Sequence, residues 1–320
     1  MKITLLDTAT FGTDISLEKF KQLGEVTAYE YSNQNQAAER LAQDDPDVVI
    51  VNKVVMNAEL MAKAPNLKMI AETATGFNNI DLKYAADHGI RVANVPEYST
   101  KAVVQHTFAL CFYVLEKLSY YDHYVKSGDY AKSPVFTHLA KVFPEIDGKT
   151  WGIIGLGAIG SSAAKVAEAF GCKVMVYSAS GHKYDTEYEQ VDFDTLLKES
   201  DILSIHAPLN EYTNGLMNYD AFCKMKNSAI LVNVGRGPIV NDADLVRALK
   251  EEQIAGAGLD VLSVEPITED NPLNEIKDSS KLIITPHIAW APFETRERLM
   301  NEVYENISAY AKGEERNCVK

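Results

Sequence analysis

The sequence predicts an α/β protein built from two doubly wound parallel-sheet domains. Short apolar runs alternate with amphipathic stretches along the whole chain, which is the pattern of a parallel sheet with crossover helices. The 320 residues exceed what one hydrophobic core usually organises. A second series of strands and helices begins at Lys149, after a long helical stretch and a connection with glycine and proline.

The first series contains four predicted strands and four predicted helices. A longer helix follows from Ser99 or Thr100 to about Tyr120, because either residue can cap it and its apolar residues form one broad face. Gly89 is a suitable helix-stopping residue before the fourth strand. The strands are expected at 3–7, 48–51, 67–71 and 91–95, and the helices at 16–23, 35–43, 57–64 and 81–88.

The second series contains six predicted strands and four predicted helices, with Asp242 expected to cap the last of these helices. A closing helix over 292–311 can return to the first series, which would make that domain discontinuous. The longest connection is expected over 126–147. The strands are expected at 150–155, 173–178, 202–206, 229–234, 255–260 and 282–285, and the helices at 158–170, 192–199, 218–225 and 242–251.

Composition excludes several classes of protein. The net charge of −14 repels phosphate backbones, so a nucleic-acid partner is not expected. No stretch reaches the roughly 18 apolar residues of a membrane helix, and the first apolar run is too short for a secretion signal. The four cysteines form no metal-binding or disulfide pattern, so we expect no metal. We therefore expect a cytoplasmic protein.

A glycine-rich turn lies between a predicted strand and a predicted helix. Gly155 permits a tight turn, Gly157 lets the backbone approach a pyrophosphate, and Gly160 lets the helix pack closely on the strand. The same pattern alone also occurs as a purely structural turn. Here the predicted strand, helix and next strand follow one another at the expected spacing, which favours dinucleotide binding at this turn. Ala158 and Ile159, at the start of the helix, are expected to contact the cofactor as well.

The residue after the second strand of this series decides which dinucleotide fits. An acidic residue there accepts a hydrogen bond from the ribose of NAD. Ser178 stands at this position and has no charge to repel a 2′-phosphate, and Ser180, His182 and Lys183 follow in the same loop. An uncharged hydrogen bond from Ser178 would also suffice for NAD. The sequence thus leaves NAD(H) and NADP(H) both open.

Three polar residues follow later strands of the second series. Arg236, Glu265 and His287 should project at the carboxyl edge of the sheet, where ligands of such folds bind. Arginine can hold a carboxylate with its planar fork, and histidine can donate a proton near neutral pH when a carboxylate supports its charge. Singly, each residue has an ordinary structural explanation. Together, downstream of the dinucleotide turn, they favour an active site that reduces a 2-keto acid.

Several segments together resemble the D-2-hydroxyacid dehydrogenase family. They are 76–81, 94–96, 155–160, 206–209, 233–237, 259–266 and 286–287, and they span nearly the whole chain. The resemblance implies that His287 is the acid/base, Glu265 its partner, and Arg236 the residue that binds the substrate carboxylate.

The resemblance also implies the remaining site residues. Pro208 would pack beside the nicotinamide, Asp260 and the backbone near Val234 would hold its carboxamide, and Trp290 would either wall the substrate pocket or serve packing. The implied cofactor contacts are Gly155, Gly157, Ala158, Ile159, Gly160, Ser178, Ser180, His206, Pro208, Thr213, Val234, Asp260 and His287; the implied substrate contacts are Thr75, Gly76, Arg236, His287 and Trp290.

The family fold implies a flavodoxin-like substrate domain of residues 1–100 plus 288–320, a Rossmann cofactor domain of residues 101–287, and a homodimer built through the cofactor domains. Residues 74–79 and 287–291 are most similar to the glycerate dehydrogenase (hydroxypyruvate reductase) branch. Hydroxypyruvate and D-glycerate are thus the expected substrate pair, with D-lactate or other D-2-hydroxy acids as the alternative. A nucleotide-sensing corepressor is the alternative of another class, whereas Glu265 argues against a formate dehydrogenase.

Overall fold

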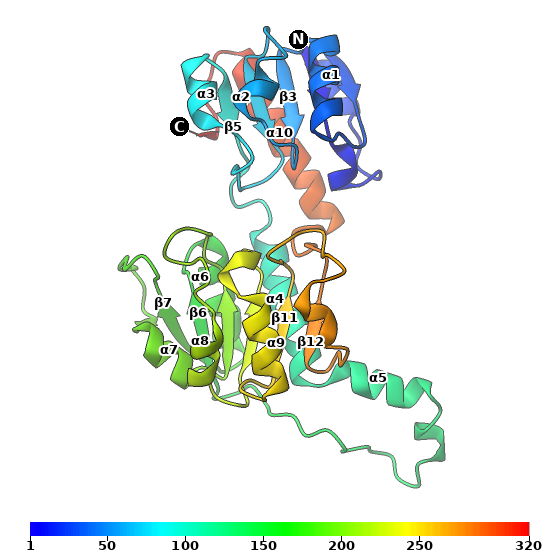
Figure 1. Ribbon diagram of the computed structural model, residues 1–320, viewed down its shortest axis with the longest axis vertical. Helices are drawn as coiled ribbons and strands as arrows, with labels where there is room; N and C mark the ends of the chain where they lie inside the picture. Colours follow the sequence, from blue (N-terminus) through cyan, green and yellow to red (C-terminus); the bar gives the residue numbers. More distant parts are fainter. Residues whose placement is uncertain (320) are drawn as a thin grey trace. The chain divides into compact units, whose positions relative to one another are not determined.

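The computed structural model describes residues 1–319, and the chain divides into two compact units (Figure 1). Unit 1 comprises Met1–Ser99 and Ala291–Lys320, and unit 2 comprises Thr100–Trp290. Each unit is built on a largely parallel sheet with helices packed against it. The predicted α/β class with two doubly wound domains is confirmed.

The sheet of unit 1 has the strand order β13-β5-β4-β3-β1-β2. Its five parallel strands follow the flavodoxin order, 2-1-3-4-5, and only β13 runs antiparallel, against β5. The four expected strands are present; β2 and β13 are additions. The bounds are β1 Lys2–Leu5, β2 Glu25–Ala28, β3 Val48–Val51, β4 Met69–Glu72, β5 Arg91–Ala93 and β13 Cys318–Val319.

The helices of unit 1 begin at side-chain caps that the sequence supplies. Asn33 forms a capping box with Gln36 at the start of α1, and Asn57 and Asp81 cap α2 and α3. The helix expected over 16–23 is a 3₁₀ segment, Glu18–Gln22. The α-helices are α1 Gln34–Asp44, α2 Ala58–Met61, α3 Leu82–Asp87 and α10 Phe293–Ala311, the last of which packs on β4.

The sheet of unit 2 has the order β12-β11-β10-β9-β6-β7-β8, and all its strands are parallel. Read from β8, this is the Rossmann order extended by one strand, and the order reverses between β6 and β9. The bounds are β6 Thr150–Ile154, β7 Lys173–Tyr177, β8 Glu189–Gln190, β9 Ile202–Ile205, β10 Ile230–Asn233, β11 Gly256–Leu259 and β12 Leu282–Ile284.

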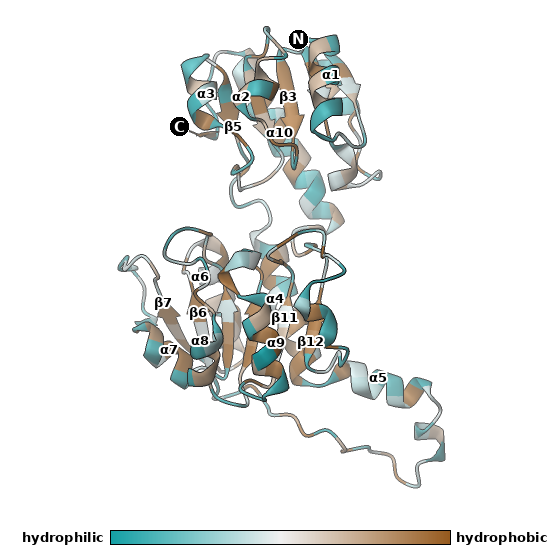
Figure 2. Cartoon of the chain, viewed as in Figure 1, coloured by the Kyte–Doolittle hydropathy of each residue, from teal (hydrophilic) through white to brown (hydrophobic). Residues whose placement is uncertain are grey.

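Helices cover both faces of this sheet. One hydrophobic cluster joins the sheet to α4 and α6, and a second joins it to α7, α8 and α9. Figure 2 shows the strands as the most hydrophobic part of the unit. Burial of both faces explains why these strands read as continuous apolar runs. The helices are α4 Thr100–Leu115, α5 Leu118–Lys126, α6 Ala158–Ala169, α7 Phe193–Glu199, α8 Tyr219–Lys224 and α9 Asp242–Lys250.

Two expectations about these helices are wrong. The long helix ends at Leu115, because Lys117 adopts a left-handed conformation (φ 56°) and α5 starts in a new direction. The cap of α9 is Asn241, whose side chain accepts from the N–H of Asp244. Asp242 is instead the first helical residue, and its buried carboxylate accepts hydrogen bonds from Ser263 and Asn271.

Candidate active site

The glycine-rich turn joins β6 to α6, and two of its glycines are required by their surroundings. Gly155 has φ +89°, and a Cβ there would lie 2.8 Å from the backbone of Ala207. A Cβ at Gly160 would lie 2.1 Å from the carbonyl oxygen of Gly155. Any larger side chain would push the helix away from the strand, so the turn needs glycine at both positions.

Gly157 differs because the space around it is open. It is the N-cap of α6, it supplies no side-chain cap, and a Cβ there would meet nothing within 4 Å. The first N–H groups of α6, including that of the exposed Ala158, are therefore accessible at the positive end of the helix dipole. This cradle fits the pyrophosphate of a dinucleotide at the sheet's switch point.

The loop after β7 carries no acidic residue at its start. Ser178 is buried, its hydroxyl lies 3.4 Å from that of Ser180, and its carbonyl accepts from the N–H of Gly181 at 3.1 Å. His182 and Lys183 follow, both exposed. The turn is thus tight, uncharged at Ser178 and followed by a cationic side chain.

The loop after β9 uses its polar groups internally. Burial lowers the pKa of His206 to about 4, and its Nε2 contacts the Ser204 hydroxyl at 3.0 Å. The His206 Nδ1 atom is buried without a partner in the described residues. The hydroxyl of the buried Thr213 donates to the carbonyl of Pro208 at 2.7 Å. The Thr213 hydroxyl is thus used within the loop, whereas His206 Nδ1 is a polar atom that a ligand could engage, and Pro208 is exposed.

The three expected catalytic residues follow three neighbouring parallel strands. Arg236 follows β10, Glu265 follows β11 and His287 follows β12. The turn after β10 also packs on the loop after β11, because a Cβ at Gly237 would lie 1.8 Å from the carbonyl oxygen of Leu262. The N–H of Leu262 in turn donates to Glu265 Oε1 at 2.9 Å.

His287 and Glu265 form a direct pair. The His287 Nδ1 atom lies 2.7 Å from Glu265 Oε2, and both side chains are about one-third exposed (31% and 33%). An ionised carboxylate accepts, so Nδ1 carries a hydrogen in this contact. The Nε2 atom is then the nitrogen that can exchange a proton with a ligand.

Arg236 presents its guanidinium at the surface. The Arg236 side chain is exposed, and its Nη1 donates to the carbonyl of Gly235 at 2.8 Å. The backbone carbonyl of Arg236 accepts a hydrogen bond from the Asn233 side chain at 3.0 Å. The guanidinium forms no ion pair with any side chain among residues 1–319. A guanidinium that has one backbone carbonyl as partner and no carboxylate is suited to an anionic ligand.

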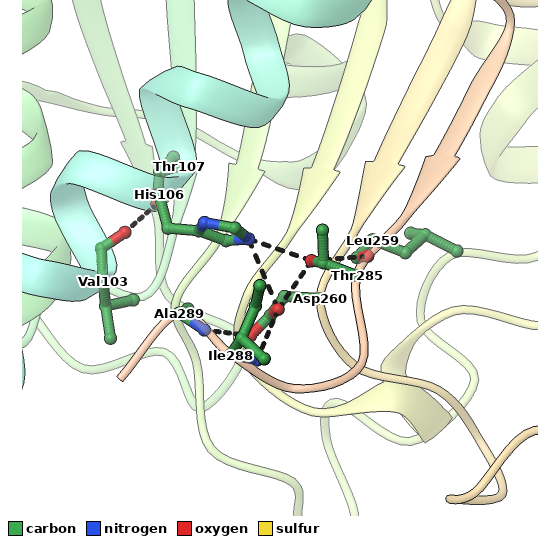
Figure 3. A network of polar contacts seen from close by, with 8 residues as sticks. All are labelled: Val103, His106, Thr107, Leu259, Asp260, Thr285, Ile288 and Ala289. Atoms are coloured by element: carbon green, nitrogen blue, oxygen red, sulfur yellow. Dashed lines mark hydrogen bonds and ion pairs between the residues drawn. The ribbon is translucent and has the colours of Figure 1, made fainter. Parts of the chain in front are cut away.

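Asp260 contacts Thr285, Ile288 and Ala289, which lie in one loop after β12 (Figure 3). It is almost fully buried (1% exposed), and burial by itself would raise its pKa. Hydrogen bonds from His106, Thr285 and the N–H groups of Ile288 and Ala289 outweigh burial and hold the pKa below its ordinary value. Asp260 is therefore an ionised carboxylate whose oxygens are engaged by the protein.

Sequence reasoning missed His106 and Thr285. His106 lies in the second turn of α4, and its Nε2 is 2.9 Å from the Thr285 hydroxyl and 3.3 Å from Asp260 Oδ1. The only signal in the sequence is a histidine beside the apolar face of a long helix. That signal could not identify its partners, because they lie more than 150 residues away in the chain.

The remaining expected substrate contacts belong to other segments. Thr75 and Gly76 lie in unit 1, where Thr75 Oγ1 donates to the carbonyl of Val95 at 2.8 Å. Within the described residues, the N–H groups of these two residues donate no hydrogen bond to the protein. Trp290 is half-buried and is the last residue of unit 2.

Comparison with known proteins identifies the family. Residues 108–289 match the family model of the D-isomer-specific 2-hydroxyacid dehydrogenase NAD-binding domain, which is more than half of the chain. The chain belongs to this family. It is therefore a D-2-hydroxyacid dehydrogenase, an oxidoreductase that acts on CH–OH donors with NAD(H) or NADP(H).

Individual members of the family are similar over their whole length. A hydroxypyruvate reductase of Blautia hydrogenotrophica is 37% identical, with 100% of this chain and 99% of that protein covered. An acyclic imino acid reductase (Bsp5) in complex with NADPH and D-Arg is 32% identical, with a TM-score of 0.87 and full coverage of both chains. The Aquifex aeolicus D-lactate dehydrogenase with NAD and lactic acid is 28% identical, with a TM-score of 0.84 and coverage of 98% and 96%.

The described residues contain neither a metal-binding cluster nor a membrane-spanning helix. Across residues 1–319, no cluster of His, Cys, Asp and Glu side chains is suited to hold a metal ion. In the same range, no helix combines the length and apolar character needed to cross a membrane.

Proposed function

We propose that the enzyme interconverts hydroxypyruvate and D-glycerate, with Arg236, Glu265 and His287 as its catalytic residues. The proposal is carried by the His287–Glu265 pair at 2.7 Å, which joins the loops after β12 and β11, next to β10 and the Arg236 that follows it. The whole-length similarity to a hydroxypyruvate reductase supports this choice of substrate.

Each residue has a distinct task in keto-acid reduction. When bound, the reduced nicotinamide supplies the hydride to the carbonyl carbon. Arg236 binds the substrate carboxylate and orients the neighbouring carbonyl. His287 donates a proton from Nε2 to the carbonyl oxygen, and Glu265 stabilises the protonated imidazole and fixes the ring through Nδ1. In the reverse direction His287 takes the proton back from the hydroxyl.

The same proposal makes unit 2 the cofactor domain and unit 1 the substrate domain. The open cradle at Gly157 would hold the pyrophosphate in unit 2, and the Ser178 loop accommodates the ribose with or without a 2′-phosphate. The free N–H groups of Thr75 and Gly76 support unit 1 as the substrate domain, because unpaired backbone donors can bind a carboxylate. Asp260, with its oxygens engaged, would serve the nicotinamide by holding the surrounding loop rather than by direct contact.

The enzyme is also proposed to be a homodimer. A segment of unit 2 that includes α5 and the connection to β6 exposes large apolar side chains. Figure 2 shows that hydrophobic and hydrophilic residues alternate along it. Phe136 is 87% exposed, Leu139 79% and Val142 90%. Apolar groups gathered in this way are typical of a protein interface. We expect sedimentation analysis to give twice the chain mass, and Phe136→Asp with Val142→Asp to reduce it to the monomer.

The function is tested by following oxidation of NADH and NADPH with hydroxypyruvate, glyoxylate, pyruvate and branched 2-keto acids. The wild type should prefer hydroxypyruvate. His287→Ala should lose at least a hundredfold in kcat while still binding cofactor, because the glycine turn is intact. His138→Ala is a matched control on the exposed segment and should keep kcat. Cofactor binding with no turnover on any keto acid would instead indicate a nucleotide-sensing corepressor.

A further inference from the structure

We infer that His106 is a positioning residue for the reaction: it fixes Asp260, and Asp260 fixes the loop that carries His287. This inference rests on the proposed role of His287. Within residues 1–319, His106 makes no hydrogen bond or ion pair with the glycine turn, Glu265 or His287, so its effect must pass through the network drawn in Figure 3. All of its members belong to unit 2.

The hydrogen positions in this network follow from the donors available. Asp260 is ionised, so the Thr285 hydroxyl must donate its single hydrogen in the 2.6 Å contact with Asp260 Oδ1. The Thr285 oxygen then acts as acceptor in its 2.9 Å contact with His106 Nε2. Nε2 therefore carries a hydrogen, and His106 donates to Thr285 while lying 3.3 Å from Asp260 Oδ1.

Asp260 in turn holds three consecutive N–H groups. Its backbone carbonyl accepts from His287, its Oδ1 from Ile288 and its Oδ2 from Ala289, each at 2.9 Å. The N–H groups of Ile288 and Ala289 converge on the carboxylate, and a left-handed residue is a common part of such an anion-binding turn. His287, directly before them, is left-handed with φ +55°, which is uncommon for a residue other than glycine.

Asp260 thus fixes the backbone at His287, and Glu265 fixes the imidazole ring through Nδ1. A carboxylate as buried as Asp260 needs every donor around it, because an unmet acceptor in a low-dielectric interior is costly. His106 donates to Thr285, which in turn donates to Asp260. His106 lies in α4, with which the chain enters unit 2 at Thr100, and the loop held by Asp260 lies directly before Trp290, the last residue of that unit.

The test compares His106→Leu, which removes the donor, with His106→Gln, whose amide can donate from the position of Nε2. We expect His106→Leu to lower kcat at least tenfold while the KM for cofactor stays within twofold, and His106→Gln to restore most of kcat. Thr285→Val should resemble His106→Leu, because it breaks the same path. Gln105→Leu, an exposed neighbour in α4, should behave as wild type.

A readout without turnover separates this inference from the proposed function. The imidazole resonances of His287, assigned through His287→Ala, should move in His106→Leu and Thr285→Val and stay near wild type in His106→Gln and Gln105→Leu. Unmoved His287 resonances in His106→Leu, or a kcat within twofold of wild type, would overturn the role of His106. A wild type that reduces no 2-keto acid would overturn the proposed function, whatever the resonances show.

Discussion

The Nδ1 atom of His287 lies 2.7 Å from Glu265 Oε2, across 22 residues of chain and between the loops that follow two adjacent parallel strands. The contact orients the ring through Nδ1 and places a carboxylate beside it. Glu265 thereby contributes both a hydrogen-bond acceptor and a negative charge next to the proposed proton donor.

Replacing Glu265 by Gln separates these two effects. Glutamine can keep a hydrogen bond to Nδ1 but lacks the negative charge, whereas leucine removes both. We expect kcat for keto-acid reduction to fall on the order of tenfold in Glu265→Gln and further in Glu265→Leu. Steady-state rates of the two variants check this, and a kcat near wild type in both would contradict the assigned role of Glu265.

Arg236→Lys should chiefly weaken binding of the keto acid. Lysine keeps the charge but lacks the planar fork that matches a carboxylate. We expect the KM for the keto acid to rise on the order of tenfold or more, with cofactor affinity unchanged. Arg247→Lys, in an exposed ion pair on α9, is the matched control and should leave KM unaltered. A KM near wild type in Arg236→Lys would remove Arg236 from the carboxylate site.

Ser178→Asp should shift the coenzyme preference toward NADH. An aspartate at this buried position would repel a 2′-phosphate and accept from the ribose hydroxyls. We expect the ratio of kcat/KM with NADH to that with NADPH to rise about tenfold or more. Ser228→Asp, in an exposed turn before β10, controls for the added charge. Equal ratios in all three enzymes would show that the Ser178 loop does not select the coenzyme.

Glu72 makes stability depend on pH. It is fully buried at the end of β4, and burial, together with the charge of Asp7, raises its pKa well above the ordinary 4.5, although Asn79 donates to it. A raised pKa stabilises the folded state at low pH, and that stability is lost as pH rises above 4.5 toward the folded value.

Glu72→Gln removes this loss. Relative to the variant, the wild type should lose up to about 1.4 kcal/mol of unfolding free energy per pH unit above the ordinary value, until the folded pKa is reached. Urea unfolding of both proteins at pH 5 and pH 8 measures the difference. A difference that does not grow with pH would mean that Glu72 is ionised in the folded protein.

The elements that sequence reasoning found are those with an unambiguous local pattern. β3 and β6 are continuous apolar runs buried on both faces, and the glycine turn carries its own geometric requirements. β2 was missed because it is a four-residue strand at the sheet edge, with no fully buried side chain, and β13 because it has two residues.

The residues of the site likewise fall into those that the sequence could predict and those that it could not. Arg236, Glu265 and His287 could be predicted because each follows an apolar strand, and parallel strands deliver their ends to one edge. His106 could not, because its relation to Asp260 exists only after α4 has packed on β11. The cap of α9 was misassigned because Asn241 and Asp242 are both residues that cap helices well. The choice depends on tertiary contacts, because the Asp242 carboxylate accepts hydrogen bonds from Ser263 and Asn271.

The division of the chain has a consequence for biosynthesis. Unit 2 is one uninterrupted stretch, whereas unit 1 needs α10, whose buried Leu299, Val303 and Ile307 belong to its core. On the ribosome the first ninety-nine residues cannot complete their core until α10 has been synthesised, and unit 2 can fold before that point. Until then the nascent chain carries an incomplete, apolar sheet, and termination before α10 would leave a product prone to capture by chaperones.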